Sequence, residues 1–266
     1  TQYTVETTFV GPVCKQEILE QTKSLQNKKV IIICGQLKSD VISQDIALWA
    51  EKHGWPLLLD CQSSAKSHEH AIKYYDQLLH NEAFQQQLSE AEVIIQFGVR
   101  LISKRLLKFI ASANAEYWLV NEGLERLDPN HNVDCRFVVS PEQWLKNHYK
   151  HIENNEQKHH WIDKLKALDQ QAENLLIDYD KKVPDLSEYS VIRLLAKMIP
   201  KQSKLFLGNS MPVRLFDMFC VPQANPLKVY TNRGASGIDG LAATAIGLAQ
   251  TQSEETMTLV IGDTSL

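Results

Sequence analysis

The chain has 266 residues and a mass of 30.3 kDa, which is enough for two ordinary domains with sizeable hydrophobic cores. Its formal net charge of −4, without a run of lysine or arginine, argues against a nucleic-acid binder. No apolar run approaches the roughly 18 residues needed to span a bilayer, and the N-terminal stretch does not resemble a secretory signal.

The cysteines and the chain ends add two expectations. The five cysteines are widely spaced and never form a CxxC pair, so they indicate neither a disulfide framework nor a zinc site. Such usage suits a reducing, cytoplasmic environment. The chain opens without methionine and stops just after an apolar run, which predicts an internal segment of a longer protein.

Residues 1–150 alternate strand and helix signals and predict a doubly wound α/β domain with a parallel sheet. The runs KKVIIICG at 28–35 and AEVIIQFG at 91–98 are typical of strands buried on both faces. After a threonine-rich extended stretch at 1–9, the predicted strands are 28–35, 56–60, 91–98, 117–121 and 135–139. The predicted helices are 43–53, 74–79, 82–88, 103–112 and one that begins at residue 141.

This domain lacks the fingerprint of a dinucleotide site. The turn after its first predicted strand reads CGQLKSD, with Gly35 alone where G-x-G-x-x-G is needed, and the turn after Gly98 is no richer. We therefore expect no nicotinamide or flavin in this domain.

Residues 151–184 are predicted to form a helical linker, because apolar residues recur at helical spacing over 154–182. Residues 185–266 begin a second α/β unit. Its predicted helices are 185–198, 212–219 and 241–249, and its predicted strands are 204–207, 228–231 and 256–261. We expect this second sheet to be the incomplete first part of a domain.

The segment at 232–240, NRGASGIDG, places a glycine at every third position between a predicted strand and a predicted helix. Glycine lets a ligand approach the backbone, and the first turn of a helix has unpaired N–H groups, so a ligand with anionic or hydrogen-bonding edges suits this turn. The alternative is a tight turn whose glycines only let helix and sheet pack closely.

Two other predicted strands of the second unit end in polar turns, Gly208-Asn209-Ser210 and Gly262-Asp263. In open parallel sheets ligands bind beyond the carboxyl ends of the strands, so the three turns should converge. A carboxylate at such a place suits Mg²⁺. The alternative for Asp263 is an N-cap of the next helix.

These residues resemble a known family. GNSMPVR at 208–214, NRGASGIDG at 232–240 and Gly262-Asp263 followed by Ser265 are similar to the thiamine-diphosphate enzymes, specifically the 2-succinyl-5-enolpyruvyl-6-hydroxy-3-cyclohexene-1-carboxylate synthase family of menaquinone biosynthesis. Segments 103–107 and 126–129 are similar to the central domain of that family. The resemblance implies a cofactor-free central domain at 1–150 and part of the diphosphate-binding domain at 185–266.

The resemblance implies a transferase that decarboxylates 2-oxoglutarate and adds the resulting carbanion equivalent to isochorismate. It implies that Ser210, Arg214, Arg233 and Lys104 bind the two anionic substrates. Arginine suits this role because its planar fork matches a carboxylate. Without the family context, each arginine would be expected to form a surface or interdomain ion pair.

The resemblance also implies a thiamine diphosphate site. Ile238 would lie beneath the cofactor, backbone groups of Ser236, Gly237 and Ile238 would hold its pyrimidine edge, and Asp263 would be the first protein ligand of Mg²⁺. Without the family context, Ile238 would be a core residue. The activating glutamate and the other Mg²⁺ ligands are expected outside this chain, so no catalytic residue is assigned here. We expect the chain alone to be inactive and the full-length enzyme to be a homodimer or homotetramer.

Two other functions stay open. One is another thiamine-diphosphate enzyme, such as an acetolactate-synthase-like decarboxylase or ligase, and the other is a non-catalytic α/β module that holds a phosphate ligand. The histidines do not favour a metal enzyme, because His68, His70, His80 and the pair at 159–160 follow no ligand spacing. We expect them to be solvated at the surface.

Overall fold

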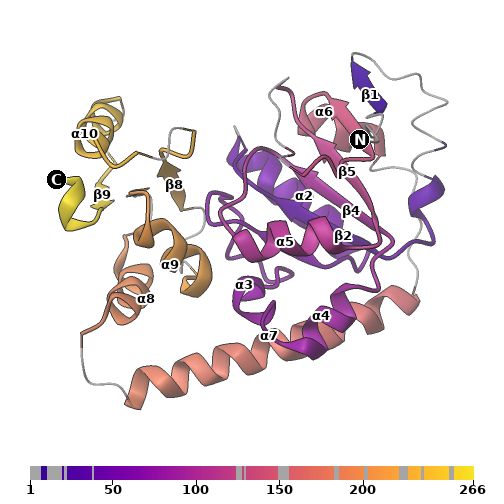
Figure 1. Cartoon of the computed structure of the whole chain (residues 1–266), viewed down its shortest axis with the longest axis horizontal. Coiled ribbons are helices and arrows are strands. Elements are labelled where there is room, and N and C mark those ends of the chain that lie inside the picture. The colour runs from indigo at the N-terminus through magenta and orange to yellow at the C-terminus, as the bar shows by residue number, and fades with distance from the viewer. Residues whose placement is uncertain are drawn as a thin grey trace.

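The computed structural model describes residues 7–10, 20, 23–37, 39–123, 128, 130–148, 156–182, 186–200, 203–221, 227–234, 237–251 and 255–266, with the side chains of 7–10 and 156–159 left undescribed. Two parallel sheets with helices packed against them make up this part of the chain (Figure 1). The predicted α/β class with a parallel sheet is therefore confirmed.

The first sheet has six strands in the order β1-β6-β5-β4-β2-β3, and all neighbours are parallel. The strands are β1 (Thr7–Val10), β2 (Val30–Cys34), β3 (Leu57–Leu59), β4 (Val93–Phe97), β5 (Glu116–Val120) and β6 (Cys135–Val138). All five strands predicted at 28–35, 56–60, 91–98, 117–121 and 135–139 are present. The sixth, β1, comes from the threonine-rich stretch and pairs with β6 at the sheet edge.

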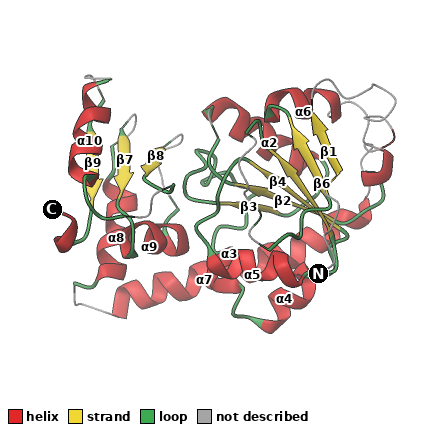
Figure 2. Cartoon of the chain, turned by 45° about the horizontal axis from the view of Figure 1, so that its top comes forward, coloured by secondary structure: helices red, strands yellow, loops and turns green. Residues whose placement is uncertain are grey.

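Helices cover both faces of this sheet (Figure 2). Alternate side chains of β2 point to opposite faces, so Ile32 joins the core beneath one helical layer and Ile33 joins the other. The first layer is α2 (Asp40–Lys52) and α6 (Pro141–His148). The second is α3 (Tyr75–Leu78), α4 (Glu82–Leu88), α5 (Lys104–Ser112) and the long α7 (Glu156–Lys182). Helix α2 begins three residues before the predicted start because Ser39, in extended conformation, takes the N-cap position.

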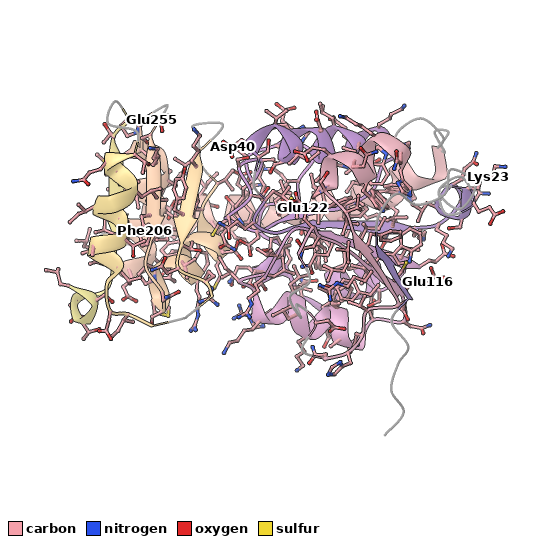
Figure 3. All side chains as sticks on the ribbon, turned by 90° about the horizontal axis from the view of Figure 1, so that it is seen from above. Lys23, Asp40, Glu116, Glu122, Phe206 and Glu255 are labelled. Atoms are coloured by element: carbon pink, nitrogen blue, oxygen red, sulfur yellow. The ribbon has the colours of Figure 1, made fainter. Side chains whose placement is uncertain are left out.

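The second sheet has three parallel strands in the order β8-β7-β9, namely β7 (Lys204–Leu207), β8 (Lys228–Thr231) and β9 (Met257–Val260). One face packs against α8 (Glu188–Met198) and α9 (Met211–Phe219). On the other face Phe206, labelled in Figure 3, packs against α10 (Leu241–Gln250). A short 3-10 turn, η1 (Asp263–Ser265), follows β9.

Asp217 of α9 connects the two units. Its Oδ1 accepts hydrogen bonds from the Cys61 backbone N–H at 2.7 Å and the Lys66 ammonium at 3.0 Å, and its Oδ2 accepts from the Tyr75 hydroxyl at 3.0 Å. The Lys66 and Asp217 side chains are 3% and 1% exposed. Lys66 also donates to the backbone carbonyls of Leu59 and Asp217 at 3.1 and 2.9 Å. These partners belong to the loops and helix that follow β3, so α9 is held against the first unit.

A second polar contact lies beside this cluster. Asp60 accepts from the backbone N–H groups of Gln62 and Ile102 at 3.0 and 2.7 Å, and Gln62 in turn accepts from the Thr231 hydroxyl at 2.6 Å. Burial, and then the nearby Asp217 carboxylate, raise the pKa of Asp60 to about 7. The end of β3 is thereby joined to the end of β8.

Within the described ranges, no helix combines the length and the apolar character that crossing a bilayer requires. Even α7, with 27 residues, carries charged side chains along its length.

The expectation that the histidines are solvated is wrong for His70. This side chain is 4% exposed, and its Nε2 lies 2.7 Å from the backbone carbonyl oxygen of Trp55, to which the neutral ring donates. Burial lowers the pKa of His70 from its ordinary 6.5 to about 4. The residues around His70 in the sequence gave no sign of its burial, because the burial comes from how the 60–72 loop packs in the folded chain.

We expect acid to destabilise the protein through His70. The pKa of His70 is about 4 in the folded chain and ordinarily 6.5, as in the unfolded chain. The contribution of its neutral ring to the free energy of unfolding is therefore fully present above pH 6.5 and is lost as the pH falls towards 4. The loss should be about 3 kcal/mol. Urea unfolding at pH 7 and pH 4 measures this loss of stability. The variant His70→Gln keeps an N–H donor but does not titrate, so it should lose less stability between the two pH values than wild type. His80→Gln, at an exposed position, is the control; equal acid sensitivity of His70→Gln and wild type would contradict the prediction.

Candidate functional site

The three polar turns of the second unit leave the sheet at one edge. Leu207, the last residue of β7, pairs with Thr231 of β8 and with Val260 of β9. Since all three strands are parallel, the segments 208–210, 232–234 and 261–263 that follow them share the carboxyl edge of the sheet. The structure thus brings together the loops that the sequence predicted to converge.

Ser210 has a strained backbone at this edge. Its φ of 73° and ψ of −129° lie in a region that residues other than glycine rarely adopt. It is the N-cap of α9, yet its side chain makes no capping hydrogen bond and is exposed. Gly208 makes the turn possible, because a Cβ there would lie 2.9 Å from Ile261 Cγ2. Strain of this kind concentrates at functional sites, so the hydroxyl of Ser210 is a candidate binding group.

A cavity of about 540 Å³ opens at the same edge and contains three of the predicted site residues, Ser210, Ile238 and Asp263. Its walls are largely apolar and come from the start of α8, the first turn of α9 and the end of β9. Ile238 is 37% exposed. The alternative of Ile238 as a core residue is therefore wrong, since it presents its side chain to the cavity.

Asp263 is the first residue of η1, and Gly262 occupies the cap position. The N-cap alternative for Asp263 is therefore wrong. The side chain is exposed, and its Oδ1 accepts from the Thr264 backbone N–H at 2.8 Å. Within the described residues its Oδ2 has no hydrogen-bond partner, so this oxygen is available to a cation.

The glycine turn faces open space. A Cβ added at Gly234, Gly237 or Gly240 would meet no heavy atom within 4 Å, so close helix packing does not explain these glycines in the described part of the chain. Gly240 has a φ of 70°, a left-handed conformation that favours glycine. Ser236 lies outside the described residues, as do Arg126, Leu127 and Pro129 of the segment 126–129.

Asn209 is a site residue that the sequence reasoning missed, although it stands in the GNSMPVR string. It is 2% exposed. Its Nδ2 donates to the backbone carbonyls of Asn232 and Gly237 at 3.0 and 2.7 Å, and its Oδ1 accepts from Arg233 Nη1 at 3.2 Å. One buried side chain therefore joins the turn after β7 to the start and the middle of the glycine turn and contacts Arg233.

A second cavity of about 350 Å³ lies between the start of α5 and α9 and contains Lys104 and Arg214. Arg105 also lines it and pairs with Asp76, which accepts from Ser103 as well. Met211 lines both cavities. The predicted substrate residues are thus divided: Ser210 lines one cavity, Lys104 and Arg214 line its neighbour, and Arg233 lines neither of the two.

The expected ion pairs of the arginines are absent from the described part of the chain, where Arg214 and Arg233 pair with no carboxylate. Lys104 is exposed, and it too has no ion pair among those residues. Of these cationic side chains, Lys104 and Arg214 line the second cavity, and without acidic partners among the described residues they suit an anionic ligand there.

A metal is not favoured at the buried acidic group Asp60, Cys61 and Asp217, although their ligand atoms lie within 4.8 Å of one another. The Lys66 ammonium already lies 3.0 Å from Asp217 and supplies the positive charge there. Burial raises the pKa of Cys61 well above its usual value, which disfavours a thiolate ligand.

Comparisons with known proteins identify the family and the fold of the chain. A family model described as the middle domain of thiamine pyrophosphate matches residues 6–207. A solved structure described as a candidate thiamin diphosphate-dependent enzyme from Mycobacterium smegmatis matches 97% of this chain and 50% of its own, with a TM-score of 0.61 and 13% identity, which shows a shared fold.

Several curated relatives carry the name 2-succinyl-5-enolpyruvyl-6-hydroxy-3-cyclohexene-1-carboxylate synthase. The one from Psychromonas ingrahamii is 42% identical over 241 residues, covering 91% of this chain and 41% of the relative. Those from Histophilus somni and Aeromonas salmonicida are each 40% identical over 243 residues, covering 90% and 91% of this chain and 40% and 41% of the relatives. The chain therefore spans about two fifths of the length of these relatives.

We expect Asn209→Asp to loosen the glycine turn. The substitution removes the N–H groups that serve the carbonyls of Asn232 and Gly237, at a cost of about 1–3 kcal/mol. Hydrogen exchange of the amides at 232–240 should accelerate. Asn132→Asp is the matched control, because Asn132 donates to the Ala111 carbonyl in the first unit. Unchanged exchange at 232–240 in Asn209→Asp would argue against the role given to Asn209.

Proposed function

Because this chain belongs to the thiamine pyrophosphate middle-domain family, we propose that it is part of a synthase dependent on thiamine diphosphate and Mg²⁺. In the full-length protein this transferase decarboxylates 2-oxoglutarate and joins the remaining four-carbon unit to isochorismate, a step of menaquinone biosynthesis. The names of the curated relatives support this assignment. We propose the same division of the chain, with a central domain at 1–150, a linker at 151–184 and part of the diphosphate-binding domain at 185–266.

The observation that carries the proposal is the 540 Å³ cavity at the carboxyl edge of the second sheet. It combines an exposed carboxylate at Asp263, an apolar side chain at Ile238 and the strained Ser210. A cofactor with an apolar ring system and an anionic tail bound to a divalent cation needs an apolar surface for its rings and a carboxylate for the cation. The neighbouring 350 Å³ cavity adds the cations Lys104 and Arg214.

The residues present fit the cofactor. Ile238 would support its rings, backbone groups of Ser236, Gly237 and Ile238 would hold its pyrimidine edge, and Asp263 would ligate Mg²⁺ beside the diphosphate. The open space at Gly234 and Gly237 leaves room for such a group. When bound, thiamine diphosphate supplies the chemistry that decarboxylates a 2-oxo acid.

The chain's own side chains bind and orient the anionic substrates. Arg214 offers a planar fork to a carboxylate and Lys104 adds a point charge at the second cavity, while Ser210 donates a hydroxyl hydrogen bond at the first. Arg233 lines neither cavity and offers its fork from the glycine turn, where it donates to Asn209. Asn209 holds the Arg233 guanidinium at 3.2 Å, so less side-chain freedom is lost when a carboxylate binds. Asp217 and Asp76 keep the α9 and α5 walls of this cavity in place.

The proposed cation ligand Asp263 can be tested by substitution. In the full-length protein Asp263→Ala should weaken Mg²⁺-dependent binding of thiamine diphosphate at least about tenfold, since a charged ligand to the ion is lost. Isothermal titration with and without Mg²⁺ measures this. Asp239→Ala, an exposed acid of the glycine turn, is the matched control. Unchanged affinity in Asp263→Ala would favour the non-catalytic phosphate-binding module.

The proposed substrate-binding residues of the second cavity can be tested in the same way. Lys104→Met and Arg214→Met should each raise KM for isochorismate or 2-oxoglutarate by about 10- to 100-fold, the value of one charge-assisted hydrogen bond. Lys108→Met, one turn further along α5, should leave both KM values within about twofold.

Turnover by the full-length protein with other 2-oxo acids but not with isochorismate would favour an acetolactate-synthase-like enzyme. We expect no product from the chain alone, which spans about two fifths of its relatives. We also propose a homodimer or homotetramer for the full-length protein, as expected for this family.

A further inference from the structure

Met211 is the residue at which the two cavities of the proposed active site meet. It is the first residue of α9, it is 38% exposed, and it lines both the 540 Å³ cavity and the 350 Å³ cavity. Among the described residues no other side chain lines both. A molecule that extends from one of these cavities into the other must therefore pass Met211.

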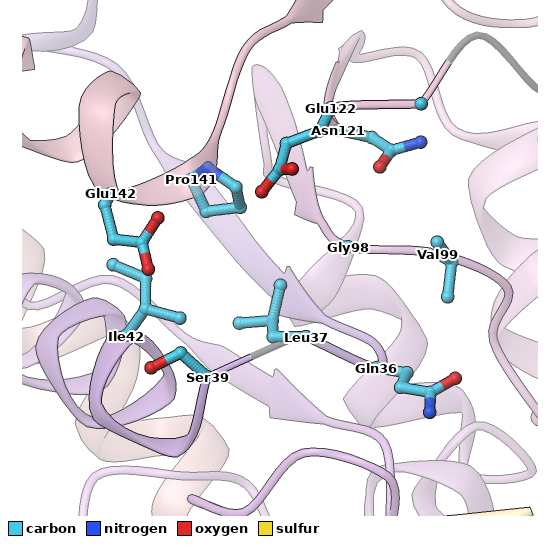
Figure 4. A pocket seen from close by; sticks show the side chains of 11 residues that line it. Gln36, Leu37, Ser39, Ile42, Gly98, Val99, Asn121, Glu122, Pro141 and Glu142 are labelled. Atoms are coloured by element: carbon cyan, nitrogen blue, oxygen red, sulfur yellow. The ribbon is translucent and has the colours of Figure 1, made fainter.

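A separate cavity of about 150 Å³ lies in the first unit, at the carboxyl ends of β2, β4 and β5 (Figure 4). Its walls include Leu37 and Ile42. Within the described part of the chain, its lining shares no residue with the two cavities of the proposed active site. The 540 Å³ cavity thus shares a wall with its neighbour along α9 and not with the cavity of the first unit.

Helix geometry explains why Met211 is the shared residue. Successive residues of an α-helix are turned by about 100° around its axis, so Pro212 and Leu215 lie on one flank of Met211 and Arg214 and Met218 lie on the other. The first pair lines the 540 Å³ cavity, and the second pair lines the 350 Å³ cavity. Met211 stands between the two flanks and separates the two spaces.

The backbone of Met211 is held in place, whereas its side chain can adapt. Ser210 before it has the strained φ of 73°, and Pro212 after it has a φ fixed by its ring. Val213 and Phe216 of the same helix have no exposed surface and pack in the core between α9 and the second sheet. The methionine side chain is unbranched and has three rotatable bonds, so it adjusts its shape to an aliphatic chain that packs against it.

The chemistry of the two cavities defines what crosses this wall. Lys104 and Arg214 in the 350 Å³ cavity suit a carboxylate, and the proposed reaction places the 2-oxo end of the substrate at the 540 Å³ cavity. A 2-oxo diacid held in this way has only methylene groups at the wall between the cavities. Methylene groups suit the thioether of Met211, because no hydrogen bond is left unmade when they pack against it.

We propose that Met211 determines the chain length of the 2-oxo diacid that the enzyme accepts. Its side chain packs on the two methylene groups of 2-oxoglutarate, between the 2-oxo end and the distal carboxylate. The third methylene group of 2-oxoadipate presses on the same side chain, so the longer substrate is disfavoured. This inference rests on the proposed function, because it takes the 2-oxo acid and the placement of its two ends from there.

Steady-state kinetics of the full-length protein test the proposal, with loss of isochorismate as the same signal for both 2-oxo acids. Met211→Ala makes room for the third methylene group. The ratio of kcat/KM for 2-oxoadipate to kcat/KM for 2-oxoglutarate should therefore rise at least about tenfold, the effect of one methylene group in an apolar pocket. Met211→Leu, which nearly conserves the volume, should keep the ratio within about threefold of wild type. A merely structural role would lower both kcat/KM values together and leave the ratio unchanged.

A binding measurement needs no turnover. Glutarate and adipate lack the 2-oxo group, and calorimetry on the full-length protein should show the affinity for adipate relative to glutarate rising about tenfold in Met211→Ala, again the effect of one methylene group. Met198→Ala is the matched control, because Met198 is an exposed methionine at the end of α8 and lines neither cavity. It should leave both ratios unchanged.

The outcomes separate this inference from the proposed function. An unchanged ratio for Met211→Ala in either measurement, or an equal change in Met198→Ala, overturns the role given to Met211 and leaves the proposed function standing. If the full-length wild type does not turn over 2-oxoglutarate with isochorismate, the proposed function is overturned and this inference with it.

Discussion

The buried ion pair between Lys66 and Asp217 is the contact on which the relation of the two sheets depends. Its atoms lie 3.0 Å apart and its side chains are almost completely enclosed. Desolvating both charges is costly, and the pair is tolerated because the Cys61 amide, the Tyr75 hydroxyl and the Leu59 carbonyl satisfy the remaining hydrogen-bonding groups. A shifted packing of α9 would leave these groups unpaired, so the cluster favours one arrangement.

That arrangement gives α9 two functions. Its first turn carries Ser210 and Met211 at the carboxyl edge of the second sheet, whereas Arg214 and Asp217, three residues apart and so neighbours on the helix surface, face the first unit. The two cavities therefore share a helix as their common wall. Any substrate held by Lys104 and Arg214 lies beside the place proposed for the cofactor.

Several features could be read from the sequence because they depend on local chemistry. The strands β7 and β8 have the bounds that their short runs of sequence predicted, and Ser103 and Ser187 cap their helices as such residues usually do. Other features could not. The start of α2, the strand β1 and the burial of His70 depend on which distant segment lies opposite, and periodicity within a short window does not contain that information.

The sequence by itself determined the parallel α/β class, the glycine turn at 232–240 and the polar residues that end the strands of the second sheet, because each is set by residues adjacent in the chain. Only the tertiary structure decided that Asn209 joins two of those turns, that Lys104 and Arg214 share a cavity apart from Asp263, and that Asp217 is paired with Lys66. These relations connect residues up to 151 positions apart. They follow from how packed helices and strands exclude water, which no local pattern encodes.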